Sequence, residues 1–450
     1  MSRIRIVGGS ITKTSKGATT IEVLDGHFIS SAAKQNIWDG GEKGNTYHEY
    51  KAPEKKEVKE GVKEIERLTP LDFGSTNDKT GGLNNEGMVF GKTYQFRVKS
   101  YVKDAPKNKS DIKWLLKYHN LSENKWKEIP LPVKGDNVKI TMNNEDLCGR
   151  FVNVRAYIKD HETEANLQVW KHNRFRWFDR MVINDEITER VDNFKPWLIN
   201  QSGTSLCGMA CIFYVFAKEQ PQAYKKFAKE LFRTGVATFN NYTVTPTIDI
   251  LERQPFLPKK ILNEGNFPWH WEWVGGNQIK VNMPLIDYVT MAGTRNTDNK
   301  KYKGGEEEFQ AINWPPFMTS LSEILLGYKD VSSKGVYNPV KPLVFTTLDV
   351  ENKINDINKQ LSLGYKLILM IDSDLIDDRW DISSMDLHWV VLESPIVWNY
   401  IPGFFGAKKD EIDFKVYTWG TDPNGHKRYL KKKITSNHFM ANYNGYIKVK

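Results

Sequence analysis

The chain has 450 residues, which is too long for one ordinary domain and predicts several. Hydrophobic residues make up 40% and charged residues 26%, the balance of a globular protein rather than a disordered one. The 64 basic residues exceed the 55 acidic ones and give a formal charge of +9. This excess is spread along the chain without a concentrated basic stripe, so we expect no nucleic-acid binding.

The number of cysteines and the length of the apolar runs indicate in which cellular compartment the protein folds. Cys148, Cys207 and Cys211 are too few for a disulfide framework and provide no CxxC zinc pair. No run reaches the roughly 18–20 apolar residues of a membrane span. The start, MSRIRIVGGSITKTSKG, lacks the apolar core of a signal peptide. We therefore expect a cytoplasmic protein in the producing cell, with no metal or organic cofactor, and any export without a classical signal peptide.

The front of the chain predicts β-structure. Residues 1–55 alternate short Val and Ile runs with Gly and Asp-Gly turns and predict a small β segment. Residues 56–84 are rich first in Lys and Glu and then in Gly and Asn, which predicts a charged linker. Strand-like runs over 85–172 predict an immunoglobulin-like β-sandwich, without the Cys…Trp…Cys pattern of antibody domains. Such modules dock or space other domains.

Residues 190–450 mix helical and strand signals and predict a larger α+β domain. Residues 206–217 are apolar on every side, which predicts a fully buried helix. Pro221 and Gly235 bracket an amphipathic helix, and a further helix ends at Gly364. Four strand-like runs complete the domain: KLILMID, HWVVLES, FKVYTWG and YIKVK.

Cys207 stands in the first turn of the predicted buried helix, behind a polar, Gly-containing loop. Free backbone N–H groups and the helix dipole favour a thiolate there. Gly208 leaves the sulfur uncrowded, and Thr204 or Ser205 is a candidate N-cap. The sequence therefore predicts a nucleophile at Cys207, whereas Cys211 is expected to be an ordinary core residue.

A thiolate nucleophile needs an imidazole that pairs with it and protonates the leaving group. His388 begins the run HWVVLES, a strand that would hold it at a cleft. Asp422 follows the next strand and is the candidate that orients His388, although its Thr-Asp-Pro-Asn-Gly setting equally suits local capping of a turn. Gln201, six residues before Cys207, is the candidate oxyanion donor together with the Cys207 N–H.

These residues resemble those of the papain-like cysteine peptidases, in which a Gln precedes a Cys that opens a long helix and a distant His begins a strand. The segment from Gln201 to Cys211 is similar to the bacteriocin-processing branch. Residues 195–450 also resemble papain-like domains of secreted bacterial toxins and effectors, with Leu-Cys-Gly-x-Ala, His-Trp-Val-Val-Leu and Thr-Trp-Gly in that order. The resemblance implies Cys207 as nucleophile, His388 as general acid and base, and the preceding Gln as oxyanion donor.

The sequence departs from the family at the orienting residue. Tyr417 stands where papain-like enzymes have an Asn, and residues 398–411 lengthen the spacing from His388 to Asp422. Leu206 replaces the Asp that the bacteriocin-processing branch often has before its nucleophile. The third member of the triad is therefore the residue that the sequence defines least.

The sequence thus predicts a multidomain bacterial effector or toxin, secreted or injected, that hydrolyses amide bonds through Cys207, His388 and Asp422. The alternatives are a peptidoglycan amidase or endopeptidase, a deamidase, and a catalytically inactive binding protein. The expected partners are a protein, peptide or peptidoglycan substrate, a secretion apparatus such as type VI secretion, and an immunity protein.

Three further segments stand out. The acidic run 372–378 lacks the Gly and the closing Glu of an EF-hand loop, so we expect a solvated loop rather than a calcium site. The aromatic run 267–276, FPWHWEWVGG, fits a lid or core packing better than stacking on sugars or bases. Residues 286–299, IDYVTMAGTRNTDN, match a motif of the resembling bacterial domains and are expected to line the cleft.

Overall fold

The structure is a computed structural model, and it describes residues 60–120, 123–255, 267–274, 276–305, 308–336, 346–377, 386–404, 406–424 and 434–450. The predicted β segment 1–55 lies outside the described residues.

The described chain forms two compact units built from interleaved segments. The first contains residues 60–65, 98–136 and 153–167, and the second contains 66–97, 137–152 and 168–450, in each case as far as they are described. The division falls inside four strands, namely β1 (Val62–Arg67), β4 (Thr93–Tyr101), β8 (Arg150–Tyr157) and β9 (Ala165–Lys171). The consecutive domains expected from the sequence, 56–84, 85–172 and 190–450, stay predictions.

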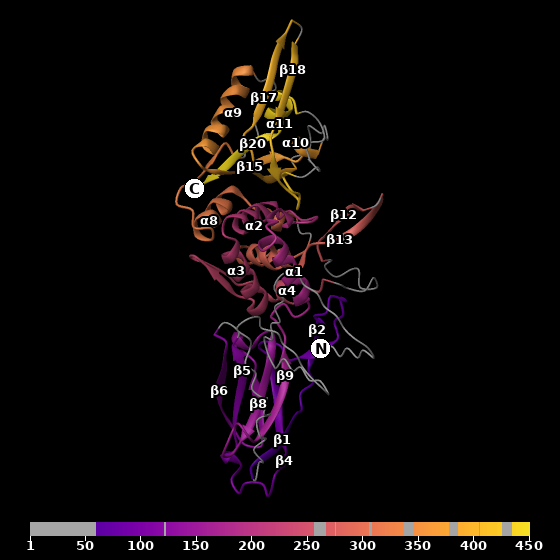
Figure 1. Ribbon diagram of the computed structural model, residues 1–450, viewed down its shortest axis with the longest axis vertical. Coiled ribbons are helices and arrows are strands. Elements are labelled where there is room, and N and C mark those ends of the chain that lie inside the picture. The colour runs from indigo at the N-terminus through magenta and orange to yellow at the C-terminus, as the bar shows by residue number, and fades with distance from the viewer. Residues whose placement is uncertain are drawn as a thin grey trace, which may run out of the picture. The chain divides into compact units, whose positions relative to one another are not determined.

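The described part of residues 60–171 consists of strands, loops and two short 3-10 helices, drawn in indigo to magenta in Figure 1. A four-stranded sheet has the order β6-β5-β8-β9 and a three-stranded sheet the order β1-β4-β7. The strands not yet given are β2 (Asp72–Gly74), β3 (Asn85–Gly87), β5 (Lys113–Asn120), β6 (Lys125–Lys134) and β7 (Asn137–Thr141). Along β7 exposed and buried residues alternate, as expected when one face of a sheet packs in a core. The β-rich character is confirmed, whereas the immunoglobulin-like sandwich stays a prediction.

The helices of the second unit begin with α1 (Arg180–Val191), α2 (Cys207–Glu219) and α3 (Pro221–Thr234). Every residue of α2 from Cys207 to Ala217 is buried, which confirms the predicted buried helix. Helix α3 begins at Pro221 and ends at Thr234, and its C-terminal cap is Gly235, whose φ of 77° lies in the left-handed region. Helix α9 (Thr347–Ser362) precedes Gly364, so these helix ends follow the sequence signals.

A five-stranded sheet in the order β14-β20-β15-β16-β19 organises the C-terminal part. The four predicted runs form β15 (Lys366–Asp372), β16 (Leu387–Leu392), β19 (Val416–Tyr417) and β20 (Tyr443–Val449), and β14 (Val331–Lys334) adds an edge. Trp389 and Val391 pack in one core with α2, while Val390 and Leu392 pack in another with α9. Helices therefore cover both faces of this sheet (Figure 1), and the mixed α and β character is confirmed, although nothing establishes a papain-like domain.

Short elements connect these parts. They are β10 (Ala237–Phe239), β11 (Tyr242–Val244), α4 (Ile248–Leu251), β12 (Trp269–Val274), β13 (Asn277–Asn282), α5 (Leu285–Asp287), a π-helix (Tyr288–Ala292), α6 (Gly293–Asp298), α7 (Glu308–Ala311), α8 (Pro315–Ile324), α10 (Asp374–Asp377), β17 (Val397–Gly403), β18 (Gly406–Asp413) and α11 (Ser436–Asn442). The solvated loop expected at 372–378 is wrong for its described part, because β15 runs to Asp372 and α10 follows with Asp374 buried.

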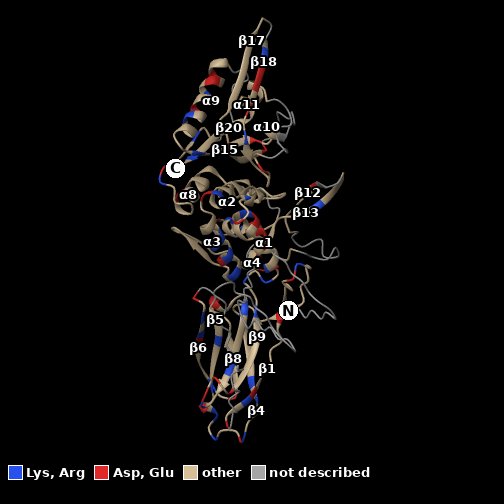
Figure 2. Cartoon of the chain, viewed as in Figure 1, with Lys and Arg blue, Asp and Glu red and all other residues tan. Residues whose placement is uncertain are grey.

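Charged residues of both signs are interspersed along the described elements (Figure 2), as the spread of charge in the sequence indicates. Among the described helices, none is long and apolar enough to cross a bilayer.

Candidate active site

Cys207 is the first residue of α2, and its side chain is only 7% exposed. The backbone N–H groups of Cys207, Gly208 and Trp389 all act on its sulfur and lower the thiol pKa. Burial is the larger effect and raises the pKa of Cys207 to about 11. The thiolate expected from the helix terminus is therefore not favoured at neutral pH in this buried setting, because desolvation outweighs the N–H groups.

The N-cap of α2 also differs from the prediction. The capping position is Leu206, which makes no side-chain hydrogen bond, so neither Thr204 nor Ser205 is the N-cap. Instead, Asn313 reaches the first turn from the segment before α8, and its Oδ1 accepts the Met209 N–H at 3.2 Å. A side chain distant in sequence thus satisfies one of the free N–H groups at the helix start.

His388 lies at the start of β16, the strand against which α2 packs. Its Nε2 forms a 2.6 Å hydrogen bond with Thr418 Oγ1, and its ring stacks on Trp419 with centroids 4.3 Å apart. Within the described part of the chain, Nδ1 makes no hydrogen bond. Burial lowers the pKa of His388 to about 3, so the imidazole is neutral at physiological pH.

A tight turn from Thr418 to Thr421 presents these partners to the imidazole. The Thr421 N–H donates to the Thr418 carbonyl at 3.0 Å. The central residues, Trp419 and Gly420, have φ values of 44° and 69°, as in a type I′ turn. A Cβ at Gly420 would lie 2.9 Å from Asn200 Nδ2, so glycine serves both the backbone conformation and the close approach of the Asn200 loop.

The structure brings Cys207 and His388 to neighbouring elements. The sulfur faces the backbone N–H of Trp389, the residue directly after His388. No hydrogen bond joins the sulfur to the imidazole among the described residues, and both groups are neutral at pH 7. The ion pair expected from the sequence is therefore not formed in this conformation, and the catalytic roles stay predictions.

Gln201 is buried in the loop that leads into α2. Its Nε2 donates to the Thr204 carbonyl at 2.8 Å, and Thr204 Oγ1 donates to the Gln201 carbonyl at 2.7 Å. These reciprocal bonds hold the loop in shape. One N–H of the Gln201 amide is used in these bonds. Donation of its second N–H to an oxyanion stays a prediction.

Asp422 caps its own turn, which is the alternative role that the sequence also suggested. Its Oδ1 accepts the Asn424 N–H at 2.8 Å. The hydrogen bond to His388 that we expected from Asp422 is made by Thr418 in this structure. Thr418 carries no signal in the sequence, because the contact depends on the turn that follows β19.

The loop before α2 is tied to a buried ion pair. Asp287 is fully buried, contacts Arg190 Nη2 at 2.6 Å and accepts the Asn200 N–H at 2.9 Å. Asp287 belongs to the motif at 286–299, so that motif supports the loop leading to Cys207. Tyr417, which replaces the family's Asn, stacks on Tyr214 and donates to the Ile199 carbonyl at 2.6 Å.

The aromatic run contributes β12, which pairs with β13 in a hairpin beside the same loop. The Gly203 N–H donates to the Trp269 carbonyl at 3.0 Å, and Ser202 Oγ is 2.7 Å from His270 Nδ1. Phe267 is buried, but Trp271 is 55% exposed. The predicted core packing therefore holds only for the start of the aromatic run, because the indole of Trp271 is exposed to solvent.

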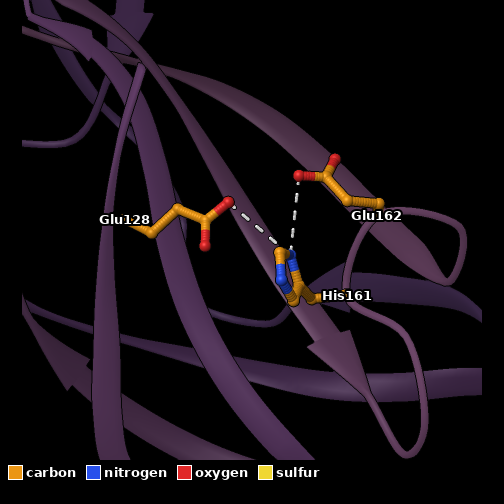
Figure 3. Close-up of side chains that lie close together, drawn as sticks. All are labelled: Glu128, His161 and Glu162. Atoms are coloured by element: carbon orange, nitrogen blue, oxygen red, sulfur yellow. Dashed lines mark ion pairs between the residues drawn. The ribbon is translucent and has the colours of Figure 1, made fainter. Parts of the chain in front are cut away.

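Glu128, His161 and Glu162 in the first unit have metal-ligand chemistry, with ligand atoms within 4.8 Å of one another (Figure 3). Lys117 Nζ lies 3.1 Å from Glu128 and also contacts Glu162, and Arg155 is 3.2 Å from Glu162. These cations already balance the two carboxylates, so we interpret the cluster as a surface network of ion pairs.

A cavity of about 480 Å³ lies in the second unit near the end of α2 and is lined by Lys218, Glu219, Tyr365, Lys366 and Glu393, among others. Its polar groups are mutually paired, since Lys218 contacts Glu393 and Lys366 lies 3.2 Å from Glu219. Lys218 is about 16 Å along the helix from the start of α2, so this cavity is separate from the candidate site.

No family model matches the chain, and neither a curated protein nor a solved structure is found that matches it. We therefore infer a function from the chemistry of the residues themselves.

Proposed function

We propose that the second unit hydrolyses amide bonds by papain-like thiol chemistry, with Cys207 as nucleophile and His388 as the group that moves the proton. The observation that carries the proposal is the position of the Cys207 sulfur. It lies at the N-terminus of a buried helix, and the backbone N–H of Trp389, the residue after His388, acts on it. Among the described residues the imidazole of His388 is held through Nε2 alone.

Thr418 gives the imidazole a defined role in this proposal. When Nε2–H donates to Thr418 Oγ1, the lone pair of His388 lies on Nδ1, where it can accept the proton of Cys207. The sulfur then bonds to the carbonyl carbon and the carbonyl electrons move to oxygen. Collapse of this intermediate breaks the C–N bond, His388 returns the proton to the leaving nitrogen, and water hydrolyses the thioester. The Cys207 N–H and the second N–H of Gln201 stabilise the oxyanion.

The resting site holds a neutral pair in this account. With pKa values of about 11 and about 3, transfer of the proton before attack spans about 8 units. That is roughly 11 kcal/mol before the attraction between the ions is counted. Both shifts come from desolvation, so we propose that proton transfer accompanies the attack rather than preceding it.

We propose proteolysis as the reaction and a delivered bacterial effector or toxin as its setting, with an immunity protein in the producing cell. The exposed indole of Trp271 beside the site favours one second candidate, a peptidoglycan amidase or endopeptidase, because an aromatic face can pack against the C–H face of a sugar ring.

The test is hydrolysis by purified full-length protein of a denatured protein mixture and, separately, of soluble muropeptides, with products read by mass spectrometry. Cys207→Ala should abolish cleavage, and Cys211→Ala, a core residue of the same helix, should retain it. Cleavage of muropeptides alone would favour the second candidate. Equal products from wild type and Cys207→Ala would refute the proposed nucleophile, and no cleavage of either substrate would favour a binding protein.

A further inference from the structure

Asn313 is a buried amide, 1% exposed, at the start of α2. Its Cβ occupies the space in which a Cβ on Gly208 would stand, since the two would lie 2.6 Å apart. Its Oδ1 accepts the Met209 N–H, and its backbone carbonyl accepts the Trp389 indole N–H at 2.9 Å. Asn313 therefore contacts both the helix that carries Cys207 and the strand that carries His388.

The nitrogen of the Asn313 side-chain amide has no hydrogen-bonding role that the fold explains. Nδ2 is fully buried and has no hydrogen-bond partner among the described residues. The Met209 N–H requires an acceptor, which fixes Oδ1 toward the helix and leaves Nδ2 as the donor on the same carbon. A buried amide donor without a partner is costly, so it requires an explanation.

We propose that Asn313 is a further catalytic residue of this site, and that its Nδ2–H donates to the oxyanion formed when Cys207 attacks a carbonyl. This inference rests on the proposed thiol chemistry. Among the described residues Nδ2 makes no hydrogen bond in the resting site, as expected of a donor that is used only after the carbonyl oxygen has gained charge. It joins the Cys207 N–H at the positive end of the α2 dipole.

Acetylation by p-nitrophenyl acetate tests this role without the natural substrate. Cys207 Sγ bonds to the acetyl carbon, p-nitrophenolate leaves with the bonding electrons, the thiol proton passes to His388, and water later hydrolyses the thioester. Alkylation of the same sulfur by iodoacetamide displaces iodide and forms no oxyanion. The ratio of the acetylation rate to the alkylation rate at Cys207 therefore isolates the contribution of an oxyanion donor.

We expect this ratio to fall about 10²-fold in Asn313→Ala and in Asn313→Asp, as for removal of an oxyanion donor. Asn313→Asp retains an acceptor for the Met209 N–H, so it carries the test if the alanine variant does not fold. Its charge disfavours the thiolate in both reactions, and the ratio cancels that effect. Repulsion between the carboxylate and the oxyanion slows acetylation alone and adds to the expected fall. Asn296→Asp is the matched control, because Asn296 is equally buried but has both amide atoms paired, and its ratio should equal that of wild type.

An unchanged ratio in both Asn313 variants would overturn the inference and leave the proposed nucleophile intact. Acetylation that never occurs at Cys207, judged by the mass of its peptide, would overturn the inference and the proposed function together.

Discussion

Thr418 holds the imidazole of His388 through an uncharged hydroxyl. A carboxylate in this place would stabilise the imidazolium, whereas a hydroxyl fixes the ring without adding charge. Together with burial, this arrangement keeps the imidazole of His388 neutral at physiological pH. At the residue scale, the site is therefore defined by desolvation and by hydrogen bonds from the backbone.

Replacing Thr418 by Val removes the hydroxyl and keeps the shape of the side chain. We expect Cys207 acetylation to slow about fivefold, because an oriented hydrogen bond contributes about 1 kcal/mol to holding the ring. The measurement is the p-nitrophenolate burst, with Thr421→Val as the control at the other end of the turn. Equal slowing in the two variants would show that the hydroxyl of Thr418 has no special role.

Part of this site follows from sequence reasoning. The buried helix at Cys207 and the strand at His388 are visible because apolar runs and a polar loop mark them locally. Thr418 is not predictable in this way, since its contact depends on positive φ at Trp419 and Gly420. Asn313 is missed because its partner Met209 lies 104 residues away and an isolated Asn carries no motif.

At the scale of elements, the start of α2 is packed without spare room. Gly208→Ala should destabilise the protein by about 1–3 kcal/mol, because a Cβ there would lie 2.6 Å from Met318 Sδ and from Asn313 Cβ. The helical preference for Ala over Gly, about 1 kcal/mol, does not offset this overlap. Denaturant unfolding measures the change.

Gly293→Ala in α6 is the matched control for this substitution. The nearest atom to its added Cβ, Leu231 Cδ2, is 3.5 Å away, which is ordinary contact, and we expect an unchanged or slightly raised free energy of unfolding. A stabilised Gly208→Ala variant would contradict the close packing of Asn313 on α2.

The first residues of the β12–β13 hairpin bond to the loop before Cys207, so under the proposed function we expect this hairpin to contact the substrate. Trp271→Ala should raise KM several-fold on the substrate found above and leave kcat near its normal value, since only binding contact is lost. Trp126→Ala is the control, an indole of similar exposure in the first unit. An unchanged KM would exclude the hairpin as a contact.

At the scale of the whole molecule, each of the two compact units is built from stretches that are not consecutive in the sequence. Composition and turn patterns are read in continuous stretches of sequence, so they predict domains that follow one another along the chain. The contacts group residues 66–97 and 137–152 with the C-terminal half. Pairing of residues 93–97 of β4 with β7 joins two of these segments across about 40 residues of chain, which no local sequence pattern predicts.

Buried His388 also shapes the stability of the whole protein toward acid. Its folded pKa of about 3 lies below the roughly 6.5 of an exposed histidine, so the unfolded state binds the proton more readily between these values. Stability should be complete above pH 6.5 and fall toward pH 3 by about 1.4 kcal/mol per unit from this group. His388→Gln should show a correspondingly flatter decline in denaturant unfolding, and parallel curves would contradict the buried neutral imidazole.

The most direct measurement of the central claim is the rate of iodoacetamide alkylation at each cysteine of the folded protein, resolved by peptide mass spectrometry. Cys207 and Cys211 lie one turn apart in α2, and burial raises the pKa of both. If His388 accepts the proton of Cys207, that sulfur should react at least about tenfold faster than Cys211, and His388→Gln should remove the difference. Equal rates for the two cysteines, or a Cys207 rate indifferent to His388, would contradict the account.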